Sequence, residues 1–473
     1  MFRDKKVQSL TEGPIFSKIL LFALPIMLTG LLQTLYNIAD TVVVGAYSGD
    51  AAIGAIGSTA AINSIILNII IGISGGAGVV VAHALGAKEN ERVSRATHTA
   101  MALSLIIGLL LATLGFILAR PILTLNNTKA DFLDDAVLYL QIICLGIPAS
   151  SVCNFSASIL RSTGDSKSPM IILSSAGLIN VALNLVFVLI FGMAVDGVAL
   201  ATIISQYVSA FFMVLVLMKK KGESYAFSFN KLAIHTGELK RILILGIPAG
   251  VQGSLFSLAN IVLTNGVNTF PPTTVTAYTI TNQIDAITFV IINAFQHAST
   301  TFVGQNYGAR RPDRIKKILL FSLIQVTVIG ILIGQAELFF SEELCTLFLM
   351  SEETNPENKL LIINTATSMM QMFLTTYFLC GIMEVLTGVL RGLGHSVAPM
   401  IMALTGACGF RIFWRFFIFP YFFADTPLGL LISFPISWIL TITMMAIALL
   451  IVWKKMNKLQ VFDNKKETVE NVQ

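Results

Sequence analysis

The chain has 473 residues, of which 55% are hydrophobic and 12% are charged, and its formal net charge is +5. A soluble domain carries roughly 25% charged residues, so this composition excludes an ordinary soluble globular protein. The basic excess does not indicate nucleic-acid binding, because the Lys and Arg residues are concentrated in alternate connections between apolar segments.

Apolar segments recur along the whole chain, and each is long enough to cross a bilayer as a helix. The first segment is far longer than the core of a signal peptide and lacks a small-residue cleavage site, so we expect it to remain as a membrane helix. In chain order, we expect twelve membrane-spanning helices, over residues 15–45, 51–82, 93–119, 132–156, 168–192, 196–218, 240–267, 275–303, 314–338, 360–386, 397–421 and 427–453.

The chain contains a duplication. Pro25 and Asn37 of the first half recur as Pro248 and Asn260 at the same sequence offset. The motif Leu-Arg-x-x-Gly-x-Ser-x-x-Pro-Met likewise occurs once in each half. Because each half holds an even number of predicted spans, both halves enter the membrane in the same orientation, as a parallel repeat. We therefore expect an all-α polytopic membrane protein with two pseudo-symmetric six-helix lobes around a central cavity.

A shift in composition separates the two repeats. Residues 219–239 are basic and polar, so we interpret them as a cytoplasmic linker between an N-terminal lobe over 15–218 and a C-terminal lobe over 240–453. Residues 454–473 form a polar tail. Most of the 31 Lys and Arg residues fall in the termini, the linker and alternate loops. By the positive-inside rule, we expect a multi-pass protein of the cell membrane with both termini in the cytoplasm.

We place three acidic residues at membrane depth: Asp40, Asp285 and Glu384. A charge at the centre of a membrane helix costs roughly 2.5–3.5 kcal/mol on insertion scales, so such residues usually serve a function or have a partner. The acidic stretch over residues 337–358 is expected instead to be a solvated loop, and the alternative is a vestibule that attracts cations.

Asp40 has polar neighbours on its own predicted helix. Gln33, Asn37 and Asp40 follow the spacing i, i+4, i+7 and share one face, and Tyr36 lies one turn before the acid. The fifth and sixth predicted spans carry further polar residues, namely Asn180, Asn184 and Thr202.

If these faces converge, a carboxylate, two amide oxygens and a hydroxyl form an oxygen-lined pocket in the first lobe. A carboxylate shielded from water can exchange a proton near neutral pH, and hard oxygen ligands suit a hard cation. The alternative is that the acid only caps a hydrogen-bond network between helices. We predict a site for H⁺ or Na⁺ formed by Asp40, Asn180, Asn184 and Thr202, with Asn37 and Tyr36 beside it.

The intramembrane acids do not repeat: Leu263 stands at the position that corresponds to Asp40. The lobes therefore share a scaffold and differ in chemistry. Asp285 and Glu384 would contact a cationic substrate or a second coupling ion; equally, either is a structural partner of an arginine in the eleventh span, Arg411 or Arg415. We expect the substrate cavity to include Gln33, Asn260, Tyr278, Asn282, Asp285, Glu384 and Arg411.

Other features have narrower consequences. Pro25 and Pro248 each remove a helix hydrogen bond and permit a bend. The bend is either a fixed kink that serves packing or, in the first helix, a bend that changes when Asp40 is protonated. His297 is interpreted as a packing residue. The glycines of residues 72–78 indicate close helix packing, since no Gly-Lys-Ser/Thr follows them. Without a nucleotide-binding motif or Cys-x-x-Cys, we expect no ATP, metal cofactor or disulfide framework.

Several motifs follow one another in a fixed order: Leu24-Pro25, Tyr36-Asn37-Ile38-Ala39-Asp40-Thr41, Gly86-Ala87, Leu160-Arg161-Ser162-Thr163-Gly164-Asp165, Tyr307-Gly308-Ala309 and Leu390-Arg391-Gly392-Leu393-Gly394. In this order and in duplicate, they resemble the multidrug and toxic compound extrusion (MATE) family, in particular its MepA-type bacterial branch. The resemblance covers residues 15–453. It implies an alternating-access antiporter that expels organic cations in exchange for H⁺ or Na⁺.

The resemblance also implies roles for single residues. By position, Asp40, Asn180, Asn184 and Thr202 match the cation site that the family has in its first lobe. Position 184 is often Asp in the family, and some members have a glutamate where this chain has Phe256. Asp40 is therefore the only carboxylate in this pocket. The expected partners are small cationic or amphipathic molecules and the lipid bilayer. We expect no cofactor apart from the coupling ion, H⁺ or Na⁺. We also expect the protein to be a monomer.

Two alternatives have different requirements. A lipid-linked precursor flippase of the same superfamily would need a cationic cavity for a pyrophosphate headgroup, and Arg411 and Arg415 are few and one-sided for this purpose. A membrane-embedded enzyme would need a catalytic signature such as paired His or a Ser-Lys arrangement. The sequence contains neither, so we expect a transporter and not an enzyme.

Overall fold

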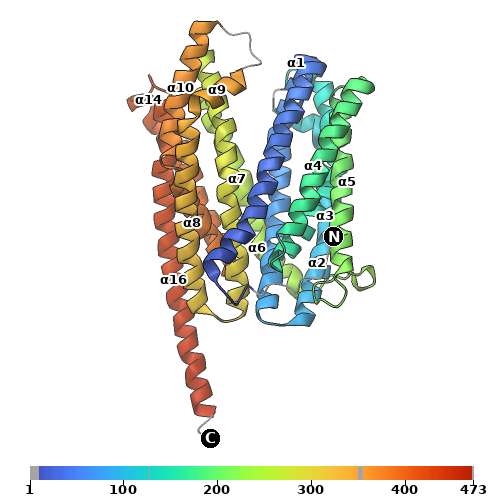
Figure 1. The fold of residues 1–473 in the computed structure, drawn as a ribbon, viewed down its shortest axis with the longest axis vertical. Helices are drawn as coiled ribbons and strands as arrows, with labels where there is room; N and C mark the ends of the chain where they lie inside the picture. Colours follow the sequence, from blue (N-terminus) through green and yellow to red (C-terminus); the bar gives the residue numbers. More distant parts are fainter. Residues whose placement is uncertain (1–9, 127, 350–354, 471–473) are drawn as a thin grey trace.

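The computed structural model describes the backbone of residues 10–126, 128–349 and 355–470, and the side chains of these residues except 38–53 and 457–470. Within this part of the chain the structure is helical, without a β-strand (Figure 1). Eleven helical segments are long and apolar enough to cross a membrane, and the bent pair Pro356–Leu374 and Tyr377–Gly392 supplies a twelfth span. The predicted all-α, twelve-span membrane protein is confirmed.

The first repeat consists of five helices and one π-helical turn. Helix α1 contains two spans, Ile15–Asn37 and Gly54–Gly86. The elements are α1 (Ile15–Gly86), α2 (Asn90–Leu125), α3 (Ala130–Ser162), α4 (Lys167–Leu185), the π turn η1 (Val186–Ile190) and α5 (Val195–Lys219).

The second repeat is more interrupted. After a 3₁₀ turn in the linker, η2 (Phe229–Lys231), three long helices follow: α6 (Thr236–Val267), α7 (Pro272–Gly308) and α8 (Pro312–Phe339). The remaining elements are α9 (Ser341–Leu349), α10 (Pro356–Leu374), α11 (Tyr377–Gly392), α12 (Val397–Ala403), η3 (Leu404–Gly409), α13 (Phe410–Phe413), η4 (Trp414–Ile418), α14 (Phe419–Phe422), α15 (Leu428–Leu431) and α16 (Ser433–Glu470).

The repeated Leu-Arg-x-x-Gly motif ends a helix in the same way in both halves. Gly164 follows α3 with φ +90°, and Gly394 follows α11 with φ +85°. An L-residue rarely adopts this left-handed conformation, whereas glycine does so without steric cost. The duplication predicted from the motif is therefore also a duplication of backbone geometry.

The tenth predicted span, 360–386, is not one straight helix. The chain bends by 44° between α10 and α11. At the break, the hydroxyl of Thr375 donates to the carbonyl of Gln371 at 2.6 Å, and that of Thr376 donates to the carbonyl of Met372 at 3.2 Å. Hydroxyls that bond to the preceding turn compete with the helix ladder and bend it. Hydropathy alone does not detect this break.

The prediction of a solvated loop over residues 337–358 is wrong for its first part. Glu337 belongs to the last turn of α8 and is 9% exposed. The short helix α9 follows and buries Cys345 and Leu349. Residues 350–354 lie outside the described part of the chain.

Helix α1 crosses from one lobe to the other, as the dark blue ribbon in Figure 1 shows. In its first half, Phe22 packs edge-on against Phe302 of α7, with ring centroids 5.7 Å apart. Farther along, Gly30 lies against Val290 of the same helix. By residue 36 the helix has reached the first lobe, where the hydroxyl of Tyr36 donates to the carbonyl of Ser174 in α4 at 3.3 Å.

Helix α6 makes the reciprocal crossing. In its first half, Gly246 and Gly250 lie against Gly76 and Gly72 of α1 so closely that a side chain at any of these positions would meet the opposite backbone. The predicted close packing of the glycine cluster is confirmed. In its last turns, α6 enters the core of the second lobe, where Leu263 is 1% exposed.

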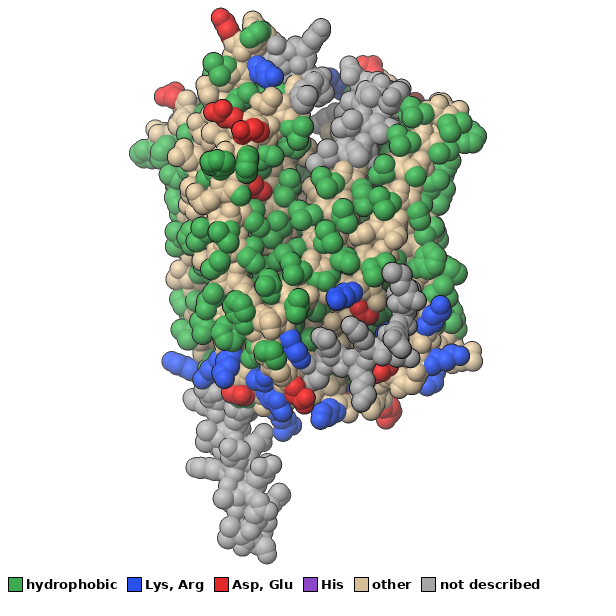
Figure 2. All heavy atoms as spheres, in the orientation of Figure 1, with side chains coloured by type: hydrophobic (Ala, Val, Ile, Leu, Met, Phe, Trp, Pro, Cys, Tyr) green, Lys and Arg blue, Asp and Glu red, His purple; other side chains and the backbone are tan. Residues whose placement is uncertain are grey.

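The surface is divided as a membrane protein requires. Figure 2 shows hydrophobic side chains over the middle of the bundle and Lys and Arg gathered at one end. We call this the basic end; the α1–α2 and α7–α8 connections lie there. The two lobes are joined at this end, because His83 Nε2 lies 2.7 Å from the carbonyl oxygen of Gly392 and Gln305 Nε2 donates to the carbonyl of Ser162 at 2.7 Å.

Candidate functional site

The polar faces of α4 and α5 meet inside the first lobe. Asn180 and Asn184 are buried, with 8% and 0% exposure. Asn180 Nδ2 donates to Thr202 Oγ1 at 3.4 Å, and the Thr202 hydroxyl donates to the carbonyl of Val198 at 3.0 Å. The structure therefore brings together Asn180 and Thr202, with Asn184 buried one turn farther along α4.

Helix α1 approaches this group from the side of α4. The ring of Tyr36 rests on Gly177, which lies one turn before Asn180. The two helices run in the same direction, because both begin near Gln305, which bonds Leu10 ahead of α1 and Ser162, the last residue of α3, ahead of α4. One turn after Tyr36, the backbone of α1 is thus level with Asn180. That position is Asp40, whose side chain lies outside the described residues.

The other predicted residues of α1 are more accessible. Gln33 and Asn37 are exposed, as is Asn260, the repeat counterpart of Asn37 on α6. Pro25 and Pro248 lie inside α1 and α6, in the halves that pack against the opposite lobe. Their role in bending stays a prediction.

Asp285 faces the interior of the second lobe. It is partly buried, and its Oδ1 atom is buried without a hydrogen-bond partner in the described part of the chain. The Tyr377 hydroxyl of α11 lies within hydrogen-bonding reach of this side chain. One face of α7 also brings Tyr278 and Asn282 within reach of each other. Three predicted cavity residues therefore share one region of α7.

Glu384 has a different partner from those that the sequence suggests. Gln296 Nε2 of α7 donates to Glu384 Oε2 at 2.8 Å, and the nearby charged group is Arg391 of the same helix. Among the described residues, neither Glu384 nor Asp285 forms an ion pair with Arg411 or Arg415. The direct ion pairs considered from the sequence are therefore absent from this part of the chain.

Arg411 is held by α16 and not by an acid. Its Nε donates to Ser437 Oγ at 2.9 Å, and its guanidinium lies 4.0 Å from the ring centroid of Phe434 and 5.9 Å from that of Trp438. Only 3% of the residue is exposed. A guanidinium can be retained in an apolar interior by such stacking and hydrogen bonding. It still lies close enough to Asp285 for electrostatic attraction.

The sequence misses Glu337. This carboxylate accepts a hydrogen bond from Thr288 Oγ1 of α7 at 2.6 Å, in the interface between α7 and α8. Thr288 lies three residues after Asp285, so both project from one face of α7. Glu337 escapes detection because it stands at the end of an apolar segment, beside exposed acids such as Glu342. Its helical register with the apolar residues of α8 is the signal that predicts burial.

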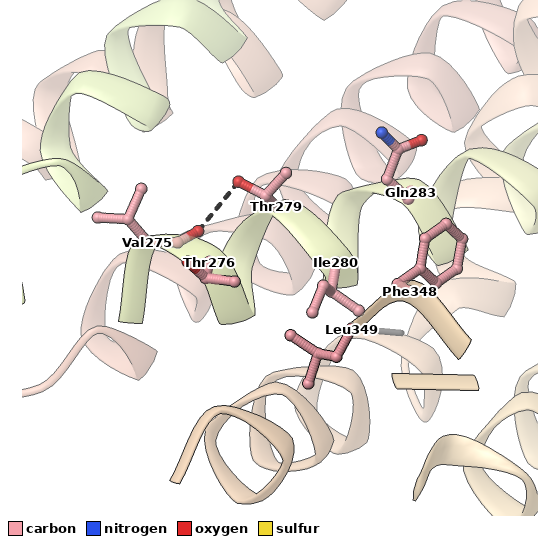
Figure 3. Close-up of a pocket in the computed structure, with 7 residues that line it drawn as sticks. All are labelled: Val275, Thr276, Thr279, Ile280, Gln283, Phe348 and Leu349. Atoms are coloured by element: carbon pink, nitrogen blue, oxygen red, sulfur yellow. Dashed lines mark hydrogen bonds between the residues drawn. The ribbon is translucent and has the colours of Figure 1, made fainter. Parts of the chain in front are cut away.

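A pocket of about 230 Å³ lies between α7 and α9. Figure 3 shows its wall, in which Thr279 donates to the carbonyl of Val275 at 3.0 Å. None of the predicted cavity residues lines it. The lining residues are Val275, Thr276, Thr279, Ile280, Gln283, Phe348 and Leu349.

Within the described residues, no group of three or more His, Cys, Asp or Glu side chains could hold a metal ion. The proposed Na⁺ ligands include Asp40, which lies outside this set. The group at Asn180 and Thr202 supplies amide and hydroxyl oxygens, the ligand type that hard cations prefer. A cation site in the first lobe stays a prediction.

A model of a protein family, described as MatE, matches residues 25–186 and 248–417. Both repeats are therefore matched separately. The probable multidrug resistance protein YoeA of Bacillus subtilis (strain 168) is 25% identical over 457 residues, which cover 95% of this chain and 96% of YoeA. The multidrug export protein MepA of Staphylococcus aureus (strain MSSA476) is 26% identical over 411 residues, which cover 85% of this chain and 87% of MepA.

The fold is also found in solved structures. A crystal structure described as MATE in complex with MaL6 superposes with a TM-score of 0.88 over 97% of this chain and 100% of that chain, at 21% identity. At this identity the likeness establishes the fold, with its two lobes, and no more.

Proposed function

Because this chain belongs to the MatE family, we propose that it is a secondary active transporter that exports organic cations by alternating access in exchange for H⁺ or Na⁺. Relatives named as multidrug resistance and multidrug export proteins support this proposal. They do not favour a lipid-linked precursor flippase. We propose further that the protein acts as a monomer in the cell membrane, with the basic end in the cytoplasm.

The observation that carries the proposal is the path of α1. This helix packs against the second lobe through Phe22 and against the first lobe through Tyr36. A change in the region after Tyr36 can therefore act on the contact between the lobes. Asp40 follows Tyr36 by one turn of α1 and is the only acid that the sequence assigns to this pocket. We propose that Asp40 carries the coupling ion, with Asn180, Asn184 and Thr202 as oxygen partners.

The second lobe provides the groups for the exported molecule. Asp285 is partly buried, and one of its carboxylate oxygens has no hydrogen-bond partner within the residues that the structure describes. A carboxylate in a low-dielectric surrounding attracts a cationic group much more strongly than it does in water. Tyr278 and Asn282 lie on the same helix and add an aromatic surface and an amide. We propose that a cationic drug binds here, whereas the coupling ion binds in the first lobe.

Transport of ethidium by reconstituted protein tests the function. Proteoliposomes that contain the full chain should accumulate or expel ethidium when a proton or sodium gradient is imposed, and the ion that drives the movement is the coupling ion. Asp40→Asn should abolish uphill transport and leave the protein folded. Glu343→Gln, which changes an exposed acid of α9, is the matched control and should transport normally. Unchanged gradient-driven transport by Asp40→Asn would contradict the role of this carboxylate.

A further inference from the structure

The interior of the second lobe contains one more acid than it can balance. Glu384 lies near Arg391 of the same helix, so their opposite charges offset each other. Among the described residues, the remaining interacting charged groups are Asp285 on α7, Glu337 on α8 and Arg411 on α13, whereas Arg415 lies apart, over Phe419 and against Gly266. With both carboxylates ionised, this second group carries two negative charges and one positive charge. Burial makes an uncompensated charge costly, so the group favours the uptake of one positive charge.

The two carboxylates belong to one constellation. Thr288 donates to Glu337 and projects from the same face of α7 as Asp285. Asp285 and Glu337 are close enough to repel each other, and the hydroxyl of Tyr377 is within hydrogen-bonding reach of Asp285. Carboxylates that repel each other in a buried site hold one proton between them more readily than none. The Asp285 Oδ1 atom has no hydrogen-bond partner among the described residues and can accept from a donor or bind a cation.

Arg411 offsets one of the two negative charges of Asp285 and Glu337, and its single positive charge cannot offset both. Its guanidinium is fixed by the bond to Ser437 and by stacking on Phe434. It makes no ion pair with Asp285 or Glu337 in the described part of the chain. The other titratable groups that face Asp285 are Tyr278, Tyr377 and Cys380, which are neutral near pH 7 and leave the count unchanged.

We propose that Asp285 and Glu337 together bind a single monovalent positive charge, which is either a proton or the cationic group of the exported molecule. This inference rests on the proposed function. It adds Glu337 to the substrate site and states that a proton and the exported cation compete for that site. Because both occupants neutralise the same excess charge, the arrival of an organic cation expels the proton to the solvent. The exchange of one proton for one monocation is thus a binding equilibrium of the second lobe that does not need Asp40, whereas uphill transport still depends on the coupling ion at Asp40.

Proton release on dye binding tests the exchange directly. The probe is ethidium, a permanent monocation, titrated into purified full-length Asp40→Asn protein in weakly buffered detergent solution with a pH indicator. The Asp40→Asn background removes the first-lobe carboxylate, so the signal reports the second lobe. We expect about one proton to be released per bound dye, by the linkage between the two equilibria. Adding Glu337→Gln should bring the release close to zero and weaken ethidium binding by about tenfold.

Two controls keep the result interpretable. Glu343→Gln in the same background removes an exposed acid of α9 and should release protons as the parent does. If Glu337→Gln does not give monodisperse protein, the Asp40→Asn parent alone tests the proposal. If this parent binds ethidium without releasing protons at any pH from 5 to about 8, Asp285 and Glu337 do not bind a proton and the dye in exchange. Release that persists in folded Glu337→Gln also contradicts the proposal. If ethidium does not bind the parent or the wild-type chain, the proposed function fails as well.

Discussion

The aromatic ring of Tyr36 occupies the space that a side chain at Gly177 would need, and this contact joins α1 to α4 one turn before Asn180. The hydroxyl of Tyr36 completes the contact by donating to Ser174 at 3.3 Å. Because Gly177 has no side chain, the ring of Tyr36 can pack there, and this contact sets where α1 meets the predicted cation site.

This contact predicts opposite effects for two glycine substitutions. Gly177→Ala should lower the free energy of unfolding by roughly 1–3 kcal/mol, because the added methyl group displaces the ring of Tyr36. Gly57→Ala, at an exposed helical position with open space around it, should raise stability by about 0.5–1 kcal/mol. Thermal unfolding of both variants in detergent checks the signs. Equal stabilisation by the two alanines would mean that Tyr36 does not pack on Gly177.

Much of this arrangement is predictable from the sequence, because it depends on local pattern. The apolar segments give the spans, and the spacing of Asn180 and Asn184 gives the face that meets Thr202. The repeated glycines of the Leu-Arg-x-x-Gly motif have the same left-handed backbone. Each of these features is set by residues within a few turns of one another, so periodicity and turn chemistry are sufficient to find them.

The features that the sequence does not predict depend on contacts between distant segments. The crossing of α1 between the lobes is visible only once Phe22 is seen against Phe302 and Tyr36 against Ser174. The burial of Glu337 depends on Thr288 of another helix. Hydropathy averages over a window and therefore places a single acid at a helix end in the adjoining loop.

The division of work between the lobes predicts that Asp285 affects cations selectively. Asp285→Asn should weaken binding of ethidium by about tenfold, or 1.4 kcal/mol, because it removes attraction in a low-dielectric site. Binding of a neutral dye of similar size should change little. Glu384→Gln should follow the same pattern if that acid also contacts the drug, whereas Asp40→Asn should alter the response of transport to an imposed proton or sodium gradient. Fluorescence titrations at several pH and Na⁺ values separate these cases.

The result would count against the division if all three variants lost the ion response equally. A loss of stability without selective loss of cation binding in Glu384→Gln would assign that acid to the hydrogen bond with Gln296. Circular dichroism and size-exclusion profiles of each variant distinguish a lost contact from a lost fold.

The positive-inside pattern predicts the sidedness of two exposed asparagines. Asn230 lies in the linker, and Asn358 lies near the start of α10. Both can be replaced by cysteine in a background that lacks the five native cysteines. A membrane-impermeant maleimide added outside intact cells should label Asn358→Cys and spare Asn230→Cys, because Lys and Arg keep the linker in the cytoplasm. Labelling of Asn230→Cys alone would reverse the assigned orientation, and permeabilised cells serve as the control for reactivity.

Alternating access requires the bonds that join the lobes at the basic end to break in each cycle. Gln305 Nε2 donates to the carbonyl of Ser162 at 2.7 Å, so cysteines at these two positions should be close enough to be joined by a short bifunctional reagent. A cross-link between Ser162→Cys and Gln305→Cys, in a background without native cysteines, should stop ethidium transport, and a cleavable reagent should restore it on reduction. The matched control joins Arg120→Cys to Asp134→Cys, an ion pair between α2 and α3 of the first lobe. That link lies within one lobe and should leave transport intact. If transport continued with Ser162 and Gln305 joined, the lobes would have to move without separating at the basic end, and the alternating-access cycle proposed for this chain would be contradicted.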